Sequence, residues 1–520
     1  MRILIFHGYL LRGTGSNVYN ANLAAALVKL GHEVHLLTQE PAPEEFDFVD
    51  AVGDWDEAGA LHVVARREPV LCTVYRPDIG GLLPVYVADR YEGIEARPFP
   101  DLTEAELDRY LERNVAAVAD VVARAQPDVA LANHLVMGPL ILARALADSD
   151  VPYAVKVHGS ALEYTVKPHP RFLPHAREGV AKASAVLVGS RHTAESLWAA
   201  VGDPTLEART RLGPPGVDVA AFEPREPAAA AAGLRSLSER LAAEGAAPGG
   251  AGGFGRDPAG AAVALGALEP GRERIVGFVG KLIVSKGIDL LLAAWPLVLA
   301  RVPSARLVVV GFGGWSDAAL DLVAALGAGD LATVRALAQA GREAEGGPRG
   351  PLNRLLSFLD DLDADPEGRD AYLAAAAELP ERVVFAGRLE HAELVDLLPA
   401  CEALVVPSTF PEAFGMVAAE AAAAGALPVS ADHSGLAEVS RVLAAAVPPE
   451  ARAWLAFPVG DAAVAGLAAR LVDWLEAPAD LRAQTRRALV AAARERYSWE
   501  GVASGVIAAA EGRLDELPRP

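Results

Sequence analysis

Cysteine is scarce in this sequence: 520 residues contain two, Cys72 and Cys401. Two thiols provide neither a disulfide framework nor a cysteine-based metal cluster, and they fit a reducing, cytoplasmic environment. Long apolar runs are also missing. The longest, near residues 288–300, contains Asp289 and falls short of the roughly twenty residues of a membrane-spanning helix. The N-terminal MRILIFHGYL lacks a small-residue cleavage site and predicts a core strand, so only a peripheral membrane contact stays open.

Basic charge is in short supply as well. The chain has 47 Lys and Arg against 68 Asp and Glu, for a net charge of -21. Binding a phosphate backbone needs a basic face, so this balance argues against nucleic acid as the main partner. Any anionic substrate must be held by local cations and backbone dipoles. The length allows two or three domains, and the content of 52% hydrophobic and 22% charged residues is typical of a soluble globular protein.

The order of elements predicts an α/β fold with doubly wound parallel sheets. Residues 2–7 form an apolar strand, RILIFH, followed by the loop GYLLRGTGSN, an apolar-periodic helix and a second strand at 33–38. A second domain starts in the same way, with a strand at 275–279 and the loop and helix GKLIVSKGIDLLLAAW. Further strands are expected at 61–64, 70–74, 128–132, 153–157, 185–188, 306–311, 383–385 and 403–406, and further helices at 102–124, 467–474 and 481–497.

Two stretches interrupt this pattern. Residues 224–272 are rich in Ala, Gly and Pro, which buries little and costs much to order, so they predict a flexible interdomain insert with one helix at 234–243. Residues 315–381 form a second insert with a Gly-rich middle and an acidic run. Three roles stay open for this insert: it shapes an acceptor site, it makes an oligomer contact, or it is an insertion that the fold tolerates without a function. Residues 41–59 are acidic and read as a loop.

The most informative stretch is VVPSTFPEAFGMVAAEAAAAGALPV, residues 405–429. It predicts a strand end, a Pro-broken loop and an Ala-rich helix that stops at Gly425. The first backbone N–H groups of a helix lack partners, so the turn at 414–416 is suited to an anion. Glu412 and Glu420 flank this turn, and each carboxylate can accept hydrogen bonds from sugar or ribose hydroxyls. An isolated pair of this kind is more often two solvated surface glutamates.

The surrounding PEAFGMVAAEAAAAGALPV resembles the E-x7-E signature of retaining nucleotide-sugar glycosyltransferases of the GT-B fold, the group called family 4 or group 1. The resemblance extends over nearly the whole chain apart from the two inserts. It implies two Rossmann-like domains facing a central cleft. The expected domains are an acceptor-side domain at 1–223, the insert 224–272, a nucleotide-sugar-binding domain at 273–490 with the insert 315–381, and a C-terminal helix at 491–520 returning to the first domain.

The resemblance assigns donor-binding roles to residues of the second domain. Lys281 and Lys286 match the paired cations that clamp the donor pyrophosphate, although Arg is commoner at position 281 and Lys lacks its bidentate fork. Arg388 lies in the turn FAGRL, near which the family holds the nucleotide base. Glu420 is implied to bind the ribose and Glu412 the sugar hydroxyls. The leaving diphosphate is implied to rest on the backbone of the helix start, formed by Phe414, Gly415 and Met416.

The DHSG segment at 432–435 continues the family pattern, with the usual second glycine beside Gly435 replaced by Leu436. In the first domain, the Gly13-Thr14-Gly15 turn is a weak dinucleotide signal, but in the resemblance the Gly15 loop faces the donor diphosphate.

His134 and His158 both follow parallel strands, where residues face a ligand crevice. A lone histidine is more often packed or solvated, but the match of VKVHGS to the family favours His158, beside the transferred sugar. His169 and His175 follow in a Pro-broken segment that predicts no metal site.

The function that this resemblance implies is the transfer of a hexosyl group from a nucleoside-diphosphate sugar to an acceptor hydroxyl, with retention and without a metal or other cofactor. His158, Glu412 and Lys286 are the expected catalytic residues. No side chain is an obvious covalent nucleophile, which favours attack on the same face within an ion pair. A GT-B epimerase, a phosphorylase and a non-catalytic nucleotide-sugar-binding protein stay open as alternatives. The acceptor is left open between a carbohydrate, a lipid-linked molecule and a small molecule. The identity of the donor and the oligomeric state also stay open.

Overall fold

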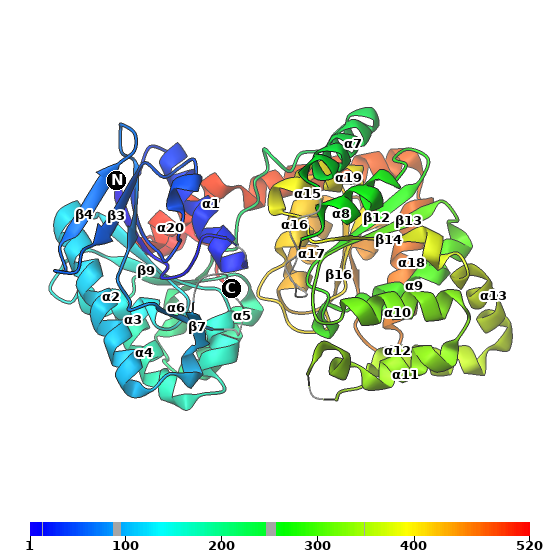
Figure 1. Cartoon of the computed structure of the whole chain (residues 1–520), viewed down its shortest axis with the longest axis horizontal. Helices are drawn as coiled ribbons and strands as arrows, with labels where there is room; N and C mark the ends of the chain where they lie inside the picture. The colour runs from blue at the N-terminus through cyan, green and yellow to red at the C-terminus, as the bar shows by residue number, and fades with distance from the viewer. Residues whose placement is uncertain (13, 87–94, 246–255, 348) are drawn as a thin grey trace. The chain divides into compact units, whose positions relative to one another are not determined.

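The computed structural model describes residues 1–12, 14–86, 95–245, 256–347 and 349–520. These residues form two compact units, which Figure 1 shows as ribbons. The N-terminal unit comprises Met1–Gly216 and Tyr497–Pro520, and the C-terminal unit comprises Val217–Arg496. The chain therefore passes between the units at residues 216 and 497, where the sequence placed boundaries at 223 and 491.

The N-terminal unit is built on a parallel sheet, as the sequence predicted. Its nine strands among the described residues follow the order β11-β10-β9-β8-β1-β2-β5-β3-β4, and β3 with β4 is an antiparallel pair. The strands are β1 (Arg2–Phe6), β2 (Glu33–Leu37), β3 (Ala51–Trp55), β4 (Leu61–Ala65), β5 (Cys72–Arg76), β8 (Val129–Asn133), β9 (Tyr153–Val157), β10 (Ala185–Val188) and β11 (Thr210–Leu212), with a small separate pair of β6 (Leu82–Val85) and β7 (Glu95–Pro98). Strand β3 lies in the stretch predicted as a loop, because its pairing with β4 and β5 outweighs its polar composition.

Helices cover both faces of this sheet. Helix α1 (Gly15–Lys29) and helix α20 (Trp499–Ala510) share one apolar core with Ile3 and Ile5 of β1. Leu4 and Phe6, which point the other way along the same strand, share the opposite core with α2 (Glu104–Ala125). The alternation follows from the two-residue period of a strand. The remaining helices of this unit are α3 (Gly138–Ala145), α4 (Leu173–Ala181), α5 (Arg191–Val201) and α6 (Leu206–Arg209).

The C-terminal unit contains a second parallel sheet. Its six strands among the described residues follow the order β14-β13-β12-β15-β16-β17. They are β12 (Arg274–Val279), β13 (Ala305–Val310), β14 (Val383–Gly387), β15 (Ala403–Val406), β16 (Leu427–Ala431) and β17 (Ala456–Phe457). The chain builds outward from β12 to β14 and then returns to add β15 on the other side of β12. The topological switch point therefore lies between β12 and β15, which is where open parallel sheets bind ligands.

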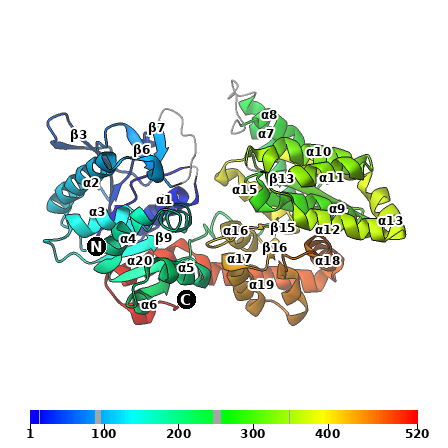
Figure 2. The ribbon, with the colours of Figure 1, turned by 90° about the horizontal axis from the view of Figure 1, so that it is seen from below.

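The helices of this unit surround its sheet in Figures 1 and 2. They are α7 (Pro227–Glu244), α8 (Pro258–Gly266), α9 (Ile288–Arg301), α10 (Ser316–Gly327), α11 (Leu331–Ala340), α12 (Asn353–Ala364), α13 (Pro366–Ala376), α14 (Leu379–Arg382), α15 (His391–Leu397), α16 (Met416–Ala423), α17 (Ser434–Ala446), α18 (Ala463–Glu476) and α19 (Ala479–Tyr497). The predicted helix at 481–497 is confirmed, and the one at 467–474 lies within α18.

The expectation of a flexible insert at 224–272 is wrong for its described part. Helices α7 and α8 pack against each other, and α7 also packs on α15. Leu234, Leu237 and Leu241 recur at helical spacing on the buried face of α7. Arg225 and Arg240 bind the two carboxylate oxygens of Asp396 at 2.6 and 2.7 Å. Periodic leucines and these ion pairs order a segment whose bulk composition suggested a linker.

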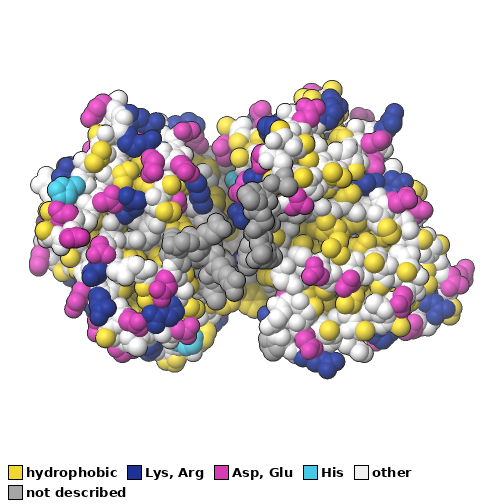
Figure 3. Space-filling model, viewed as in Figure 1, with side chains coloured by type: hydrophobic (Ala, Val, Ile, Leu, Met, Phe, Trp, Pro, Cys, Tyr) yellow, Lys and Arg dark blue, Asp and Glu magenta, His cyan; other side chains and the backbone are white. Residues whose placement is uncertain are grey.

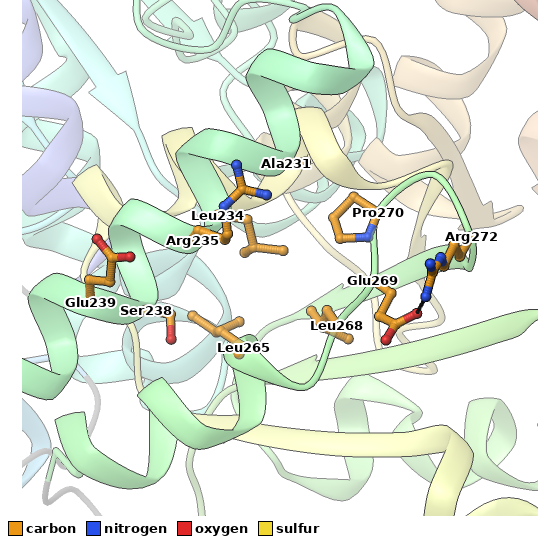
Figure 4. A pocket seen from close by; sticks show the side chains of 11 residues that line it. Ala231, Leu234, Arg235, Ser238, Glu239, Leu265, Leu268, Glu269, Pro270 and Arg272 are labelled. Carbon is orange, nitrogen blue, oxygen red and sulfur yellow. Dashed lines mark hydrogen bonds and ion pairs between the residues drawn. The ribbon is translucent and has the colours of Figure 1, made fainter.

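A cavity of about 390 Å³ lies beside α7 and α8 (Figure 4). Its lining combines Leu234, Leu265 and Leu268 with the charged side chains of Arg235 and Glu239. Among the described residues, no side chain that lines this cavity was predicted from the sequence to have a functional role.

The second insert, 315–381, adds a helical layer beside α9. Figure 2 shows α10 and α11 lying side by side, and both α12 and α13 contact α9. The Tyr372 hydroxyl of α13 donates a hydrogen bond to the Ala293 carbonyl of α9 at 2.9 Å. Buried Leu355, Phe358 and Leu359 form the inner face of α12.

Lys and Arg side chains are scattered among Asp and Glu on the visible face of each unit in Figure 3. Within the residues that the structure describes, no helix combines the length and hydrophobicity needed to cross a bilayer.

Candidate functional site

Four sequence-predicted residues of the C-terminal unit follow strands at one edge of its sheet. Lys281 and Lys286 follow β12, Arg388 follows β14, and Glu412 follows β15. Because the strands are all parallel, their carboxyl ends lie at the same edge. The loops after β12 and β15 also flank the topological switch point. The fold thus brings together residues that are more than a hundred positions apart in the sequence.

The loops after β12 and β15 are bonded directly to each other. The Thr409 N–H donates to the Ser285 carbonyl at 2.9 Å. Gly287 has a φ of +69°, and a Cβ atom there would lie 2.0 Å from the Pro407 carbonyl oxygen. Only glycine fits this close approach. The contact fixes Lys286, the neighbour of Gly287, beside the loop that contains Glu412.

Lys286 and Glu412 form an ion pair with 2.5 Å between Nζ and Oε1. The Ser408 hydroxyl donates to the same carboxylate oxygen. Both side chains are partly exposed, at 34% and 23%, so a ligand can reach them. The second oxygen of Glu412, Oε2, has no hydrogen-bond partner among the described residues. The structure therefore places a cation and an open carboxylate oxygen next to each other, while Lys281 lies exposed at the end of β12.

Helix α16 begins beside this pair. Gly415 is its N-cap, and no side chain of the described residues caps its first turn. The leading N–H groups of an uncapped helix carry partial positive charge and bind anions. Phe414, which precedes the helix, is buried to 9% exposure and anchors the turn. The backbone of Gly415 and Met416 can therefore face an anion.

Glu420 lies one turn further along α16 and is 3% exposed. Its Oε1 pairs with His391 Nε2 at 2.8 Å. Burial alone would lower the pKa of His391, but the hydrogen bond and charge of Glu420, together with Asp218, raise it above its ordinary value. The Phe222 ring packs against the imidazole, with 5.1 Å between ring centroids. Oε2 of Glu420 has no hydrogen-bond partner among the described residues.

His391 was missed by the sequence reasoning. It begins α15 just after β14, at the same sheet edge as the predicted residues. That position, one helix start beyond a parallel strand, was the available signal. Arg388 leaves the same strand but turns to Glu390, at 3.1 Å, and lies over the Phe312 ring at 5.4 Å. Among the described residues, Arg388 forms no hydrogen bond or ion pair with Glu420 or Lys286.

The loop after β16 also reaches Glu412. The Ser434 hydroxyl accepts the Glu412 N–H at 2.9 Å, and the Gly435 N–H donates to the Glu412 carbonyl at 2.9 Å. The sequence pattern placed the missing glycine at Leu436. In the structure Leu436 is buried in the first turn of α17, and the residue with left-handed backbone is Ser434, with a φ of +53°. Ser434 therefore occupies the position that favours glycine.

The second insert contacts the predicted cation loop. The Glu345 carboxylate accepts the Val284 N–H at 2.8 Å, and Arg342 binds the other oxygen of Glu345 at 3.0 Å. The side chain of Glu345 is 10% exposed. This contact could not be predicted from the sequence, because Glu345 is one acidic residue among many in a Gly-rich segment. It connects the insert to the loop between Lys281 and Lys286.

In the N-terminal unit, His158 lies in a network of buried polar side chains. Its Nε2–H donates to Asn133 Oδ1 at 2.8 Å, and Asn133 in turn donates to Asn20 Oδ1 at 2.8 Å. Asn20 also contacts His7 Nδ1 at 3.0 Å. Burial lowers the pKa of His158 well below its ordinary value, so its ring is neutral. Gly15 is the first residue of α1, whereas Gly13 lies outside the described residues.

The rings of His134 and His7 stack in the same network, with 5.8 Å between their centroids. His134 is 1% exposed, has a φ of +68°, and neither ring nitrogen has a hydrogen-bond partner among the described residues. His7 was missed by the sequence reasoning; burial lowers its pKa to about 4. No group of His, Cys, Asp and Glu side chains in the described part of the chain has the geometry of a metal site.

Both halves of the chain match known glycosyltransferase families. Residues 14–216 match the glycosyl transferase 4-like domain, and residues 368–495 match the glycosyl transferases of group 1. These ranges include Gly15, His158, Arg388, Glu412 and Glu420, but Lys281 and Lys286 fall between them. A curated relative, D-inositol 3-phosphate glycosyltransferase of Segniliparus rotundus, is 29% identical over 306 residues, 58% of this chain and 46% of that protein. The chain thus spans less than half the length of this relative.

Two solved structures share the fold over nearly their whole length. Sucrose-phosphate synthase from Thermosynechococcus elongatus has a TM-score of 0.56 and 19% identity, covering 99% of this chain and 98% of that one. Anabaena HepE, in complex with UDP and glucose, has a TM-score of 0.55 and 15% identity, covering 99% and 100%. The two parallel sheets and these likenesses define the GT-B class. The chain belongs to the group 1, family 4 glycosyltransferases.

Proposed function

We propose that this protein transfers a hexosyl group from a nucleoside-diphosphate sugar to an acceptor hydroxyl, with retention and without a metal. The observation that carries the proposal is the meeting of Lys286, Glu412 and the uncapped start of α16 at the switch point of the second sheet. A cation, an open carboxylate oxygen and a set of backbone N–H groups are what a sugar diphosphate needs. Binding of UDP by HepE, which shares the fold, supports this donor class.

The main chemical task is to stabilise the departing diphosphate. Lys286 now neutralises Glu412, and we expect it to move to the phosphate oxygens when the donor binds. Glu412 would then accept hydrogen bonds from the sugar hydroxyls. Lys281 and the N–H groups of Gly415 and Met416 add positive potential on the diphosphate. Such preorganised charge acts on the transition state, in which the negative charge of the leaving group is largest.

Glu420 is the proposed ribose ligand. His391 holds one carboxylate oxygen, and Oε2 is available for a ribose hydroxyl. A buried carboxylate that is already paired and oriented loses little freedom when it binds a ligand. Arg388 stays the proposed neighbour of the nucleotide base.

Retention is proposed to proceed by attack on the same face of an ion pair. Oε1 of Glu412 accepts hydrogen bonds from Lys286 and Ser408, and in this proposal Oε2 accepts hydrogen bonds from the sugar hydroxyls. His158 and Gly15, the first residue of α1, are proposed to act near the transferred sugar and the diphosphate. The neutral state of His158 suits a hydrogen bond to a sugar hydroxyl.

A donor screen tests the proposal. The protein is mixed with UDP-, GDP- and ADP-sugars, and the melting temperature is recorded, because a ligand that binds only the folded state raises it. Donors that stabilise the protein are then incubated with an acceptor panel, with and without EDTA, and the anomeric configuration of the product is read by NMR. We expect glycoside formation with retention that EDTA does not abolish.

Other outcomes would contradict the proposal. Epimerised nucleotide sugar without release of nucleoside diphosphate would indicate an epimerase. Turnover that requires inorganic phosphate would indicate a phosphorylase. Tight donor binding without hydrolysis or transfer across the panel would indicate a nucleotide-sugar-binding protein.

A further inference from the structure

The loop between β16 and α17 has an unusual backbone beside the candidate site. Ser434 has a φ of +53°, a region that glycine enters freely and other residues rarely adopt. Its neighbour Gly435 packs against the backbone of Ala413, where a Cβ atom would lie 2.6 Å from the carbonyl carbon. Gly435 is therefore required by space. A serine is strained in this backbone conformation, which favours glycine. We therefore expect the hydrogen bonds of the Ser434 side chain to compensate for the strain.

The Ser434 hydroxyl is the middle of a hydrogen-bond chain. His433 Nε2 lies 2.7 Å from the Ser408 carbonyl oxygen, which can only accept, so Nε2 carries the proton. In the neutral ring His433 Nδ1 is then an acceptor, and the Ser434 hydroxyl donates to it at 3.1 Å. The same hydroxyl oxygen accepts the Glu412 N–H at 2.9 Å. Each donor in the chain meets one acceptor.

This series of hydrogen bonds fixes both ends of the loop that contains Glu412, residues 408–412. His433 binds the backbone of Ser408, the first residue after Pro407, and Ser434 binds the backbone of Glu412 itself. Ser408 in turn donates its hydroxyl to the Glu412 carboxylate. The Glu412 carbonyl accepts the Gly435 N–H at 2.9 Å. Glu412 is thus fixed at its N–H, its carbonyl and one carboxylate oxygen, which leaves Oε2 in a defined place.

We propose that His433 and Ser434 are positioning residues that hold the Glu412 carboxylate in place for the transferred sugar. The inference rests on the proposed function, in which Glu412 binds the sugar hydroxyls. Neither side chain is expected to touch the nucleotide, because both act through the backbone of residues 408–412. Their loss should therefore weaken binding of the sugar and not of the nucleoside diphosphate.

The experiment measures two affinities for each protein by calorimetry. The ligand pairs are UDP-glucose with UDP, GDP-mannose with GDP, and ADP-glucose with ADP; the pair that binds the wild type is used for the variants. Ser434→Gly and Ser434→Ala both remove the hydroxyl. Glycine relaxes the backbone and alanine keeps a Cβ atom at positive φ, so the glycine variant should have the higher melting temperature. Both should bind the nucleotide sugar about fivefold more weakly, the scale of one hydrogen bond, with unchanged affinity for the nucleoside diphosphate.

His433 supplies a second test. His433→Asn keeps an acceptor near the position of Nδ1 for the Ser434 hydroxyl, whereas His433→Ala removes it. We expect a larger sugar-specific loss in the alanine variant than in the asparagine variant.

The inference is overturned if Ser434→Gly binds both ligands as the wild type does, or if it weakens both to the same extent, since the role is then absent or only structural. If the wild type binds a nucleotide sugar and the variants lose no sugar-specific affinity, the proposed function stands and the positioning role fails. A wild type that binds none of the six ligands overturns both.

Discussion

Acidification from pH 7 to pH 5 is expected to destabilise the N-terminal unit through His7, which is buried as a neutral ring beside His134. Burial lowers the pKa of His7 to about 4, against an ordinary value of 6.5. Below pH 6.5 the unfolded protein binds a proton at His7, whereas the folded protein binds that proton only near pH 4. Stability is therefore present above about pH 6.5, falls as the pH drops, and reaches its full loss near pH 4.

The size of the effect follows from the two pKa values. At pH 5 the unfolded ring is almost fully protonated and the folded ring is about one-tenth protonated, which corresponds to a loss of about 2 kcal/mol. For a unit of this size, about 2 kcal/mol is worth a fall of about 4–8 °C in melting temperature. His134 and His158 add to the loss in the same direction, because burial lowers the pKa of both.

The assay compares the melting temperature of the full-length protein at pH 7 and pH 5 for the wild type, His7→Gln and His169→Gln. Glutamine can donate to Asn17 and accept from Asn20, as the His7 ring does, but does not titrate. We expect His7→Gln to lose about 4–8 °C less than the wild type between the two pH values and His169→Gln to match the wild type. Equal losses in all three proteins, or an NMR titration of the His7 ring near pH 6.5, would show that protonation of buried His7 does not cause the loss of stability.

Three further predictions concern the C-terminal unit. Lys286→Ala should reduce turnover by about two orders of magnitude, the scale of losing one charge-stabilising donor; Arg301→Ala, which removes an exposed cation at the far end of α9, should not, and near-normal turnover by Lys286→Ala would reject its role. Glu420→Ala should weaken nucleoside diphosphate binding, and His391→Ala should do so to a lesser extent because it leaves the buried carboxylate without its partner; calorimetry with unchanged affinity in both variants would remove the ribose assignment. Glu345→Ala should weaken nucleoside diphosphate binding about fivefold because Val284 N–H loses its acceptor, whereas Glu345→Gln keeps an acceptor and should bind as the wild type does; equal affinities in the two variants would show that the insert does not support the cation loop.

Much of the fold could be predicted from periodicity. Apolar strands such as RILIFH and ARLVVV are buried on both faces, so they read as continuous hydrophobic runs that are hard to confuse with loops. The meeting of Lys286 and Glu412 was implied by the resemblance to family 4 enzymes. Parallel topology supplies its physical reason, because the ends of β12 and β15 lie side by side.

The remaining features depend on tertiary contacts that composition does not encode. The Ala-rich segment at 227–244 is ordered because its leucines recur at helical spacing and two arginines meet Asp396. His391 becomes relevant only once α15 is placed against Glu420. The left-handed backbone falls on Ser434 and not on Leu436 because the chain must turn at that point to start α17.

A crystal structure of the protein with the nucleoside diphosphate that stabilises it most tests the proposed donor site directly. We expect the diphosphate to lie on Lys281, Lys286 and the N–H groups of Gly415 and Met416, with a ribose hydroxyl on Oε2 of Glu420. A diphosphate bound elsewhere, with the Lys286–Glu412 pair intact and the start of α16 unoccupied, would contradict this expectation.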